Sequence, residues 1–121
     1  MTLKLTGGPR AAAEARAAVM RLGGDVGHRS LETLRLLVTE LVANSVRHAA
    51  ATTVHLRALA GAGGVWVEVA DDGPGFDPRE HDHTASQESG WGLFLVDQLA
   101  DRWGVRHDGR QTRVWFELQR G

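Results

Sequence analysis

The sequence has no cysteine, almost no net charge and no long apolar run. Its 121 residues carry 14 Lys and Arg against 15 Asp and Glu, a formal net charge of −1. The absence of cysteine excludes disulfides and thiolate metal sites, which fits a reducing compartment. A near-neutral chain has no electrostatic basis for sequence-independent binding to a nucleic acid backbone. We therefore expect no direct nucleic acid partner.

The sequence also contains no segment of the length that a membrane span requires. Its first residues, MTLKLTGGPRAAAEAR, contain no continuous apolar stretch, so they do not predict a signal peptide. We expect one cytoplasmic domain over residues 1–121, with no membrane partner.

The apolar residues follow two different periods along the chain. Helical spacing predicts helices over about 9–22, 30–49 and 92–100, the second of them capped by Ser30. Alternation predicts strands over 2–6, 52–59, 65–69, 103–107 and 112–118. Hairpin-linked strands with segregated helices favour an α+β fold, a two-layer sandwich in which helices cover one face of a mostly antiparallel sheet.

Glu40 and Asn44 lie four residues apart in the apolar stretch LRLLVTELVANSVRHAA. Four residues are about one helical turn, so both side chains lie on one stripe. A helix that is apolar on almost all sides is expected to be mostly buried. A buried carboxylate and amide require partners, and a ligand or metal ion is the simplest candidate.

The strand VWVEVA is followed by Asp71, then by Gly73 and Gly75. A carboxylate can accept a hydrogen bond from an exocyclic amine, and the glycines allow the backbone to approach a flat ring. The same residues also form a good turn, which is the alternative interpretation.

A second glycine-bearing segment, Gly90-Trp91-Gly92-Leu93, is expected directly before a helix. Free backbone N–H groups at a helix N-terminus form an anion site, and glycines leave room for phosphate. The alternative is a hinge for the polar loop that precedes it. No GxxxxGK[ST] motif and no GxGxxG motif is present, which argues against a P-loop or a Rossmann site.

Taken in order, these segments resemble the GHKL ATPase superfamily over roughly residues 10–118. The phrases ELVANSVRHA, VADDGPGF and GWGLFLVDQLADRWGV are most similar to the small bacterial anti-sigma-factor serine/threonine kinases. The resemblance implies the two-layer fold of GHKL (Bergerat) proteins, with ATP and Mg²⁺ as cofactors.

The resemblance also implies roles for individual residues. Glu40 would be the catalytic carboxylate, and Asn44 would bind nucleotide-associated Mg²⁺ through its amide oxygen. Asp71 would bind the adenine amino group, with Gly73 and Gly75 giving room for the base.

The resemblance also implies which residues bind the phosphates of ATP and which form a loop over it. Gly90, Gly92 and the amides near Leu93 would hold phosphates, and residues 77–89 would form an ATP lid. Trp91 stands where the family often has a basic residue, so a phosphate contact from that side chain is not implied.

Two assignments stay open at this stage. Thr112 matches a threonine that often contacts adenine, although a shift of one residue would place Arg113 there. His48, together with Arg47, could approach phosphate or metal, or could simply cap the end of the helix.

The resemblance predicts an ATP-dependent kinase that binds a sigma factor and phosphorylates Ser or Thr on an anti-sigma antagonist, with a homodimer as the expected assembly. A non-catalytic, ATP-gated interaction module shares the same motifs and is the first alternative. An orphan histidine-kinase catalytic domain is a weaker alternative. His48 lies within the expected site rather than on a separate dimerisation helix.

Overall fold

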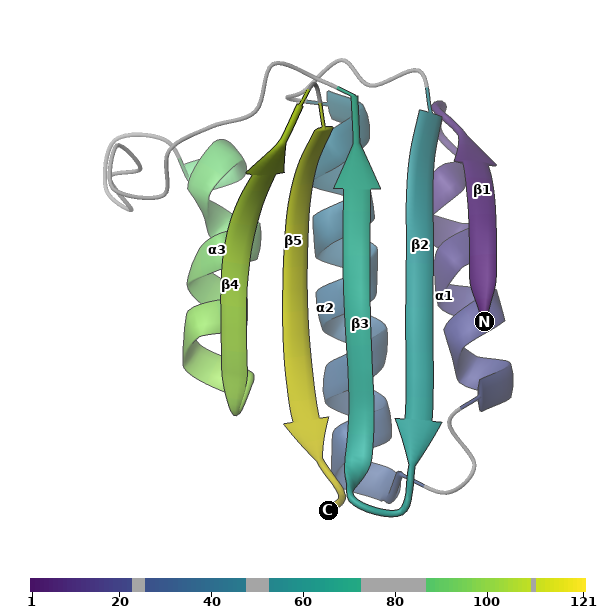
Figure 1. Cartoon of the computed structure of the whole chain (residues 1–121), viewed down its shortest axis with the longest axis vertical. Helices are drawn as coiled ribbons and strands as arrows, with labels where there is room; N and C mark the ends of the chain where they lie inside the picture. Colours follow the sequence, from purple (N-terminus) through teal and green to yellow (C-terminus); the bar gives the residue numbers. More distant parts are fainter. Residues whose placement is uncertain (23–25, 48–52, 73–86, 110) are drawn as a thin grey trace.

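The computed structural model describes residues 1–22, 26–47, 53–72, 87–109 and 111–121, with the backbone alone for 87–92. Within these residues the chain forms five strands and three helices, whose arrangement can be followed in Figure 1. The elements are β1 (Thr2–Thr6), α1 (Ala11–Leu22), α2 (His28–Arg47), β2 (Thr53–Gly61), β3 (Gly64–Asp71), α3 (Gln87–Leu99), β4 (Arg102–Asp108) and β5 (Gln111–Gln119). The predicted order of helices and strands is confirmed.

The strands form a single sheet in the order β1-β2-β3-β5-β4, and every neighbouring pair is antiparallel. All three helices of the described ranges lie behind this sheet, so none of them covers the face toward the viewer in Figure 1. The predicted α+β sandwich is therefore confirmed. We call the uncovered side the open face.

Alternation along the strands separates the two faces of the sheet. In β3 the side chains of Val65, Val67 and Val69 point toward the helices and are at most 4% exposed. Phe116 of β5 is paired with Val67 and is fully buried. Leu34 and Leu37 of α2 cover this apolar layer and are also fully buried, so the core lies between α2 and the centre of the sheet.

The expectation that α2 is buried on almost all sides is wrong. Leu36 is 40% exposed, and Glu40 and Asn44 are half-buried. The residues at full burial repeat at three- and four-residue intervals, which is the pattern of an amphipathic helix. The pair therefore does not need a ligand merely to compensate for burial.

Ser30 does not cap α2, because the helix begins two residues earlier at His28. Its hydroxyl donates a 2.5 Å hydrogen bond to the Gln119 carbonyl, and its backbone N–H donates to the Gly121 carbonyl at 3.1 Å. These bonds fix the start of α2 beside the end of β5.

Helix α3 begins at Gln87, five residues before the predicted start at position 92. Residues 87–89 of the expected lid are therefore helical, and 77–86 lie outside the described residues. Gly90 and Gly92 are the fourth and sixth residues of α3 rather than residues preceding it.

Among the helices in the described ranges, none has the length and apolar character needed to cross a membrane.

Candidate functional site

A buried carboxylate and a buried hydroxyl lie side by side at one end of the sheet. Asp71, the last residue of β3, is directly opposite Thr112 near the start of β5. They are 5% and 3% exposed. Both follow the alternation of the residues that face the helices, because Asp71 is two residues after Val69 and Thr112 is two before Val114. The arrangement places two polar groups of different hydrogen-bonding type against the core.

The pairing decides which residue of β5 faces this end of the core. Thr112 is opposite Asp71, whereas Arg113 is opposite Ala70 and points to the open face. Arg113 there binds Glu68, so the shift of one residue considered above does not apply to this sheet. Thr112 keeps the adenine-contacting assignment as a prediction.

His107 of β4 is a third polar residue in the same row, and the sequence analysis missed it. It is paired with Thr112, and its Nδ1 lies 3.4 Å from the Thr112 Oγ1. The separation is long for a hydrogen bond, so the two groups are in weak contact. A two-residue turn made of Asp108-Gly109 would pair 107 with 110, so the sequence signal did not predict this neighbour. The structure instead pairs Asp108 with Gln111 and His107 with Thr112.

Asn44 reaches the same level of the molecule as Thr112. Ser30, at the start of α2, is bonded to Gln119 at the end of β5. From that contact, about 21 Å of helix leads to Asn44 at 1.5 Å per residue. About 24 Å of strand leads to Thr112 at 3.4 Å per residue. Figure 1 agrees, with the end of α2 at the top beside the end of β3.

The side chains of the Glu40–Asn44 stripe remain partly open to solvent. The Asn44 Oδ1 accepts a 3.4 Å hydrogen bond from Arg47 one turn later, which is a weak contact. Arg47 is exposed, and His48 lies outside the described residues. The stripe can therefore bind a ligand without breaking a strong internal interaction.

The glycine segments are only partly described. Gly73 and Gly75 lie outside the described residues, directly after Asp72. The backbone N–H of Gly90 is among the first four of α3, which have no partner within the helix, whereas Gly92 lies further inside. Leu93 is 6% exposed and belongs to the core. The phosphate-binding role of these residues stays a prediction.

The hydrogen-bonding groups at this end of the sheet fit a purine nucleotide. The carboxylate of Asp71 can accept from an amino group, and the hydroxyl of Thr112 can donate or accept. The described residues contain no group of three or more His, Cys, Asp or Glu arranged to hold a metal ion. From the described residues, Mg²⁺ would take only the Asn44 Oδ1, and phosphate and water would supply the other oxygens.

Comparison with known families agrees with this geometry. The sequence model of the histidine kinase-like ATPase domain matches residues 5–118. The chain belongs to this family, so it is an ATPase domain of the GHKL kind, as its motifs indicated.

The curated relatives are much longer proteins. The chain is 41% identical over 81 residues to the sensor-type histidine kinase PrrB of Mycobacterium leprae, covering 59% of this chain and 18% of the kinase. It is 38% identical over 81 residues to PrrB of Mycobacterium tuberculosis, with the same coverage. The chain thus spans less than a fifth of these kinases.

Solved structures show the same fold. The structure of the RsbU and RsbW domains of Rv1364c from Mycobacterium tuberculosis superposes with a TM-score of 0.68 at 23% identity, covering 98% of this chain and 32% of that one. The ATP binding domain of PrrB from Mycobacterium tuberculosis gives 0.59 at 19% identity, covering 99% and 98%. These likenesses extend over nearly all of the sheet and helices.

Proposed function

We propose that this domain binds Mg-ATP at the end of the sheet marked by Asp71 and Thr112, as a regulatory protein kinase. The observation that carries the proposal is the buried Asp71–Thr112 pair at the level of Asn44 on α2. A carboxylate for the adenine amine and a hard amide oxygen for Mg²⁺ are the groups that this nucleotide complex requires. The bound Mg²⁺ would neutralise charge on the phosphates.

Glu40 is the residue proposed for the chemistry. It lies one turn before Asn44 and is half-buried, so it can contact both a bound nucleotide and an incoming hydroxyl. As general base it would take the proton of a Ser or Thr hydroxyl while that oxygen forms a bond to the terminal phosphorus of ATP. The bond from that phosphorus to the bridging oxygen breaks, and ADP leaves.

The proposed partners are a sigma factor and an anti-sigma antagonist, in the cytoplasm, with a homodimer as the proposed assembly. The RsbW-containing structure and the phrases of α2 and α3 support this choice. Phosphorylation of the antagonist would place about two negative charges in its interface and release it.

The test has two stages that separate binding from transfer. Calorimetry with Mg-ATP measures nucleotide affinity, and labelled terminal phosphate measures transfer to the cognate antagonist. We expect binding in the micromolar to millimolar range and an acid-stable phosphoester on the antagonist. ATP binding without transfer would leave the non-catalytic, ATP-gated module as the function. The ATP-gated module predicts that a Glu40→Ala variant still regulates its partner protein.

A catalytic domain of a histidine kinase is the second candidate, and the 41% identity to PrrB favours it. In that case the phosphate would go to a histidine of a phosphoacceptor helix. Phosphohistidine is acid-labile and phosphoserine is not, so acid treatment of the labelled product discriminates between the two candidates.

A further inference from the structure

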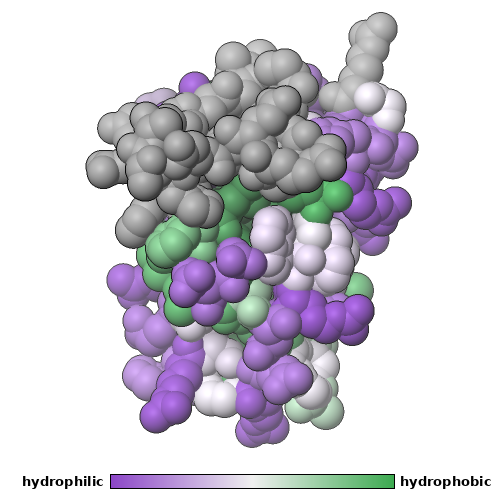
Figure 2. Space-filling view, turned by 90° about the vertical axis from the view of Figure 1, so that its left-hand side faces the viewer, coloured by the Kyte–Doolittle hydropathy of each residue, from purple (hydrophilic) through white to green (hydrophobic). Residues whose placement is uncertain are grey.

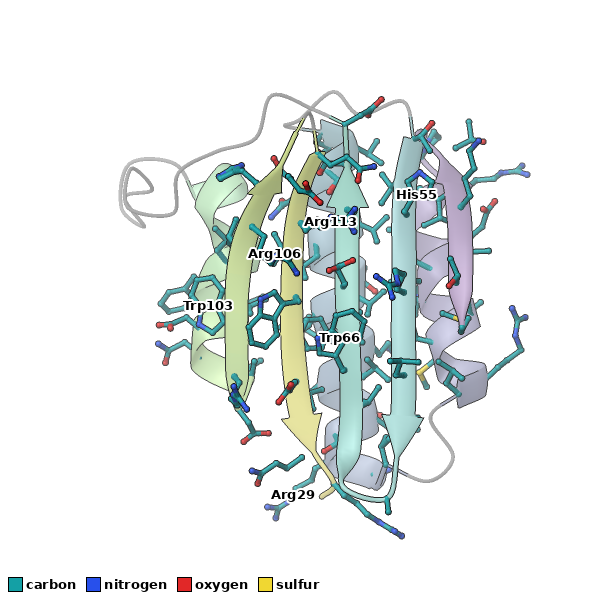
Figure 3. The ribbon with its side chains drawn as sticks, viewed as in Figure 1. Arg29, His55, Trp66, Trp103, Arg106 and Arg113 are labelled. Carbon is teal, nitrogen blue, oxygen red and sulfur yellow. The ribbon has the colours of Figure 1, made fainter. Side chains whose placement is uncertain are left out.

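The open face of the sheet carries arginine and tryptophan side chains on neighbouring strands. Figure 3 shows Trp66, Arg106, Arg113 and His55 in front of the sheet, on the side away from the helices. Cross-strand pairing places Lys4, His55, Ala70, Arg113 and Arg106 in one row across all five strands. With neighbouring strands about 4.8 Å apart, this row is about 19 Å wide.

Charge is unevenly distributed over the molecule, and cations gather on this face. The whole chain has a net charge of −1. The strand residues of the open face instead include five cations and three carboxylates, an excess of two positive charges. The cations are Lys4, Arg57, Arg102, Arg106 and Arg113, and the carboxylates are Glu68, Asp108 and Glu117.

The central carboxylate of this face is already neutralised. Glu68 is 2% exposed, and its Oε1 lies 2.9 Å from Arg113 and 3.5 Å from Arg57. It therefore presents little negative potential to an approaching molecule. The side chains of Arg57 and Arg102 are 51% and 74% exposed, so their guanidinium groups remain accessible.

Apolar and aromatic groups lie between these cations. Arg57 stands over the ring of Trp66, 5.6 Å from its centroid. Leu59, paired with Trp66, is 62% exposed. Near them a shallow groove of about 240 Å³ runs from Leu59 to Arg102 and Glu117. A half-buried tryptophan beside an accessible arginine is the composition found at the centres of protein interfaces.

We propose that the open face is a docking surface for an acidic segment of a partner protein. Charge complementarity selects the occupant. Two copies of this face would bring their excess cations together, which disfavours self-association through it. A nucleic acid carries one charge per nucleotide and so would be repelled by Asp108 and Glu117, whereas a protein segment can place uncharged residues beside them. Carboxylates of a protein segment can instead pair with the arginines, and its apolar residues can contact Trp66 and Leu59.

This surface is separate from the proposed nucleotide site. Asp71 and Thr112 point toward the helices, whereas Glu68, Arg113 and Trp66 point away from them. The segment would therefore bind with or without ATP. A failure of peptide binding can therefore be distinguished from a failure of ATP binding or phosphate transfer.

The test uses a labelled twelve-residue peptide that alternates Glu or Asp with Leu or Phe. Fluorescence anisotropy gives its Kd, and amide shifts in NMR spectra map its position. We expect shifts on strands across the open face, from β1 with Lys4 to β4 with Arg106, and a Kd that rises with salt because the contacts are ionic. Lys4→Glu with Arg106→Glu should raise the Kd at least about 10-fold, as expected for charge reversal at an electrostatic interface.

The matched control is Arg29→Glu with Arg35→Glu, two exposed residues of α2 with the same change in net charge. This variant should keep the Kd within about 3-fold, since its sites lie on the helix layer. The control peptide carries Lys in place of the acids. Asp71→Asn should leave peptide binding unchanged, whatever it does to ATP.

Three outcomes would overturn the proposal. The first is no binding of the peptide up to millimolar concentration, and the second is equally tight binding of twelve-nucleotide oligo-dT to the same face. The third is a dimer, detected by sedimentation, that Lys4→Glu with Arg106→Glu dissociates. The last two results would assign the face to nucleic acid or to a second copy.

Discussion

Asp71 and Thr112 stand directly opposite each other on β3 and β5, and both are almost removed from solvent, at 5% and 3% exposure. Residues so far apart in the sequence meet because β5 inserts between β3 and β4 in the sheet. The proposed site therefore lies on two inner strands of the sheet, at one of its ends. A ligand bound there is positioned by rigid strands rather than by a loop.

Asp71→Asn tests the carboxylate that we assign to adenine. The amide keeps the shape but replaces one acceptor oxygen with a donor, which opposes the amino group of the base. We expect the Kd for Mg-ATP to rise about 10- to 100-fold, as for the loss of a hydrogen bond to a charged group. Calorimetry measures this change directly.

The neighbouring Asp72→Asn is the matched control, because it makes the same chemical change at an exposed position. Its Kd should stay within about 3-fold of wild type. Equal effects of the two variants would show that general charge, and not a contact of Asp71, governs affinity.

Thr112→Val tests the hydroxyl of the pair while it keeps the branched shape. Removing the hydroxyl deletes any contact with nucleotide and the weak contact with His107. We expect a rise in the Kd for Mg-ATP of about 3- to 10-fold, equivalent to one neutral hydrogen bond. Thr112→Ser retains the hydroxyl and should restore most of the affinity. If Ser and Val behave alike, the hydroxyl has no role in binding.

Most of the fold could be predicted from apolar periodicity. Val65, Val67 and Val69 alternate in the sequence, and the structure places them together against the helices. The start of α3 was not predictable in this way. Residues 87–90, Gln-Glu-Ser-Gly, carry no hydrophobic period, so the pattern begins only at Leu93.

The environment of individual polar residues was harder to predict than the elements. Glu68 alternates with buried valines and so should face solvent, yet Arg113 and Arg57 from the adjacent strands cover it. That burial depends on strand order, which a local pattern does not contain. For Glu40 the error is the opposite: the sequence predicts burial, but the residue is half-buried. The many apolar residues of this segment made the amphipathic period of α2 difficult to recognise.

Glu40→Gln tests the proposed general base. The amide retains the size of the side chain but cannot accept a proton from the attacking hydroxyl. We expect phosphate transfer to the antagonist to fall about 100- to 10,000-fold, with the Kd for Mg-ATP changed by less than about 3-fold. Single-turnover transfer and calorimetry provide the two readouts.

Glu32→Gln, on an exposed turn of the same helix, serves as the control and should leave both values near wild type. A normal transfer rate in Glu40→Gln would remove Glu40 from the chemistry. Unchanged regulation of the partner by a variant that cannot transfer phosphate would favour the ATP-gated module.

Glu68→Gln tests the ion-pair cluster on the open face. The substitution removes the charged partner that lies 2.9 Å from Arg113, whose side chain is only 23% exposed. Arg113 keeps its bond to Gln111 at 2.8 Å and an ion pair with Asp108 at 3.7 Å, so the loss is smaller than for an isolated buried charge. We expect the free energy of unfolding to fall by about 2 kcal/mol. Urea denaturation followed by circular dichroism measures it.

Glu117→Gln removes the same charge at an exposed pair on the same face. Its carboxylate lies 3.8 Å from Arg102, and the two side chains are 39% and 74% exposed. Solvent screens such a pair, so the free energy of unfolding should change by less than about 0.5 kcal/mol. Similar losses for both variants would contradict the argument, because Glu68 is buried between two arginines whereas Glu117 is an exposed partner of one.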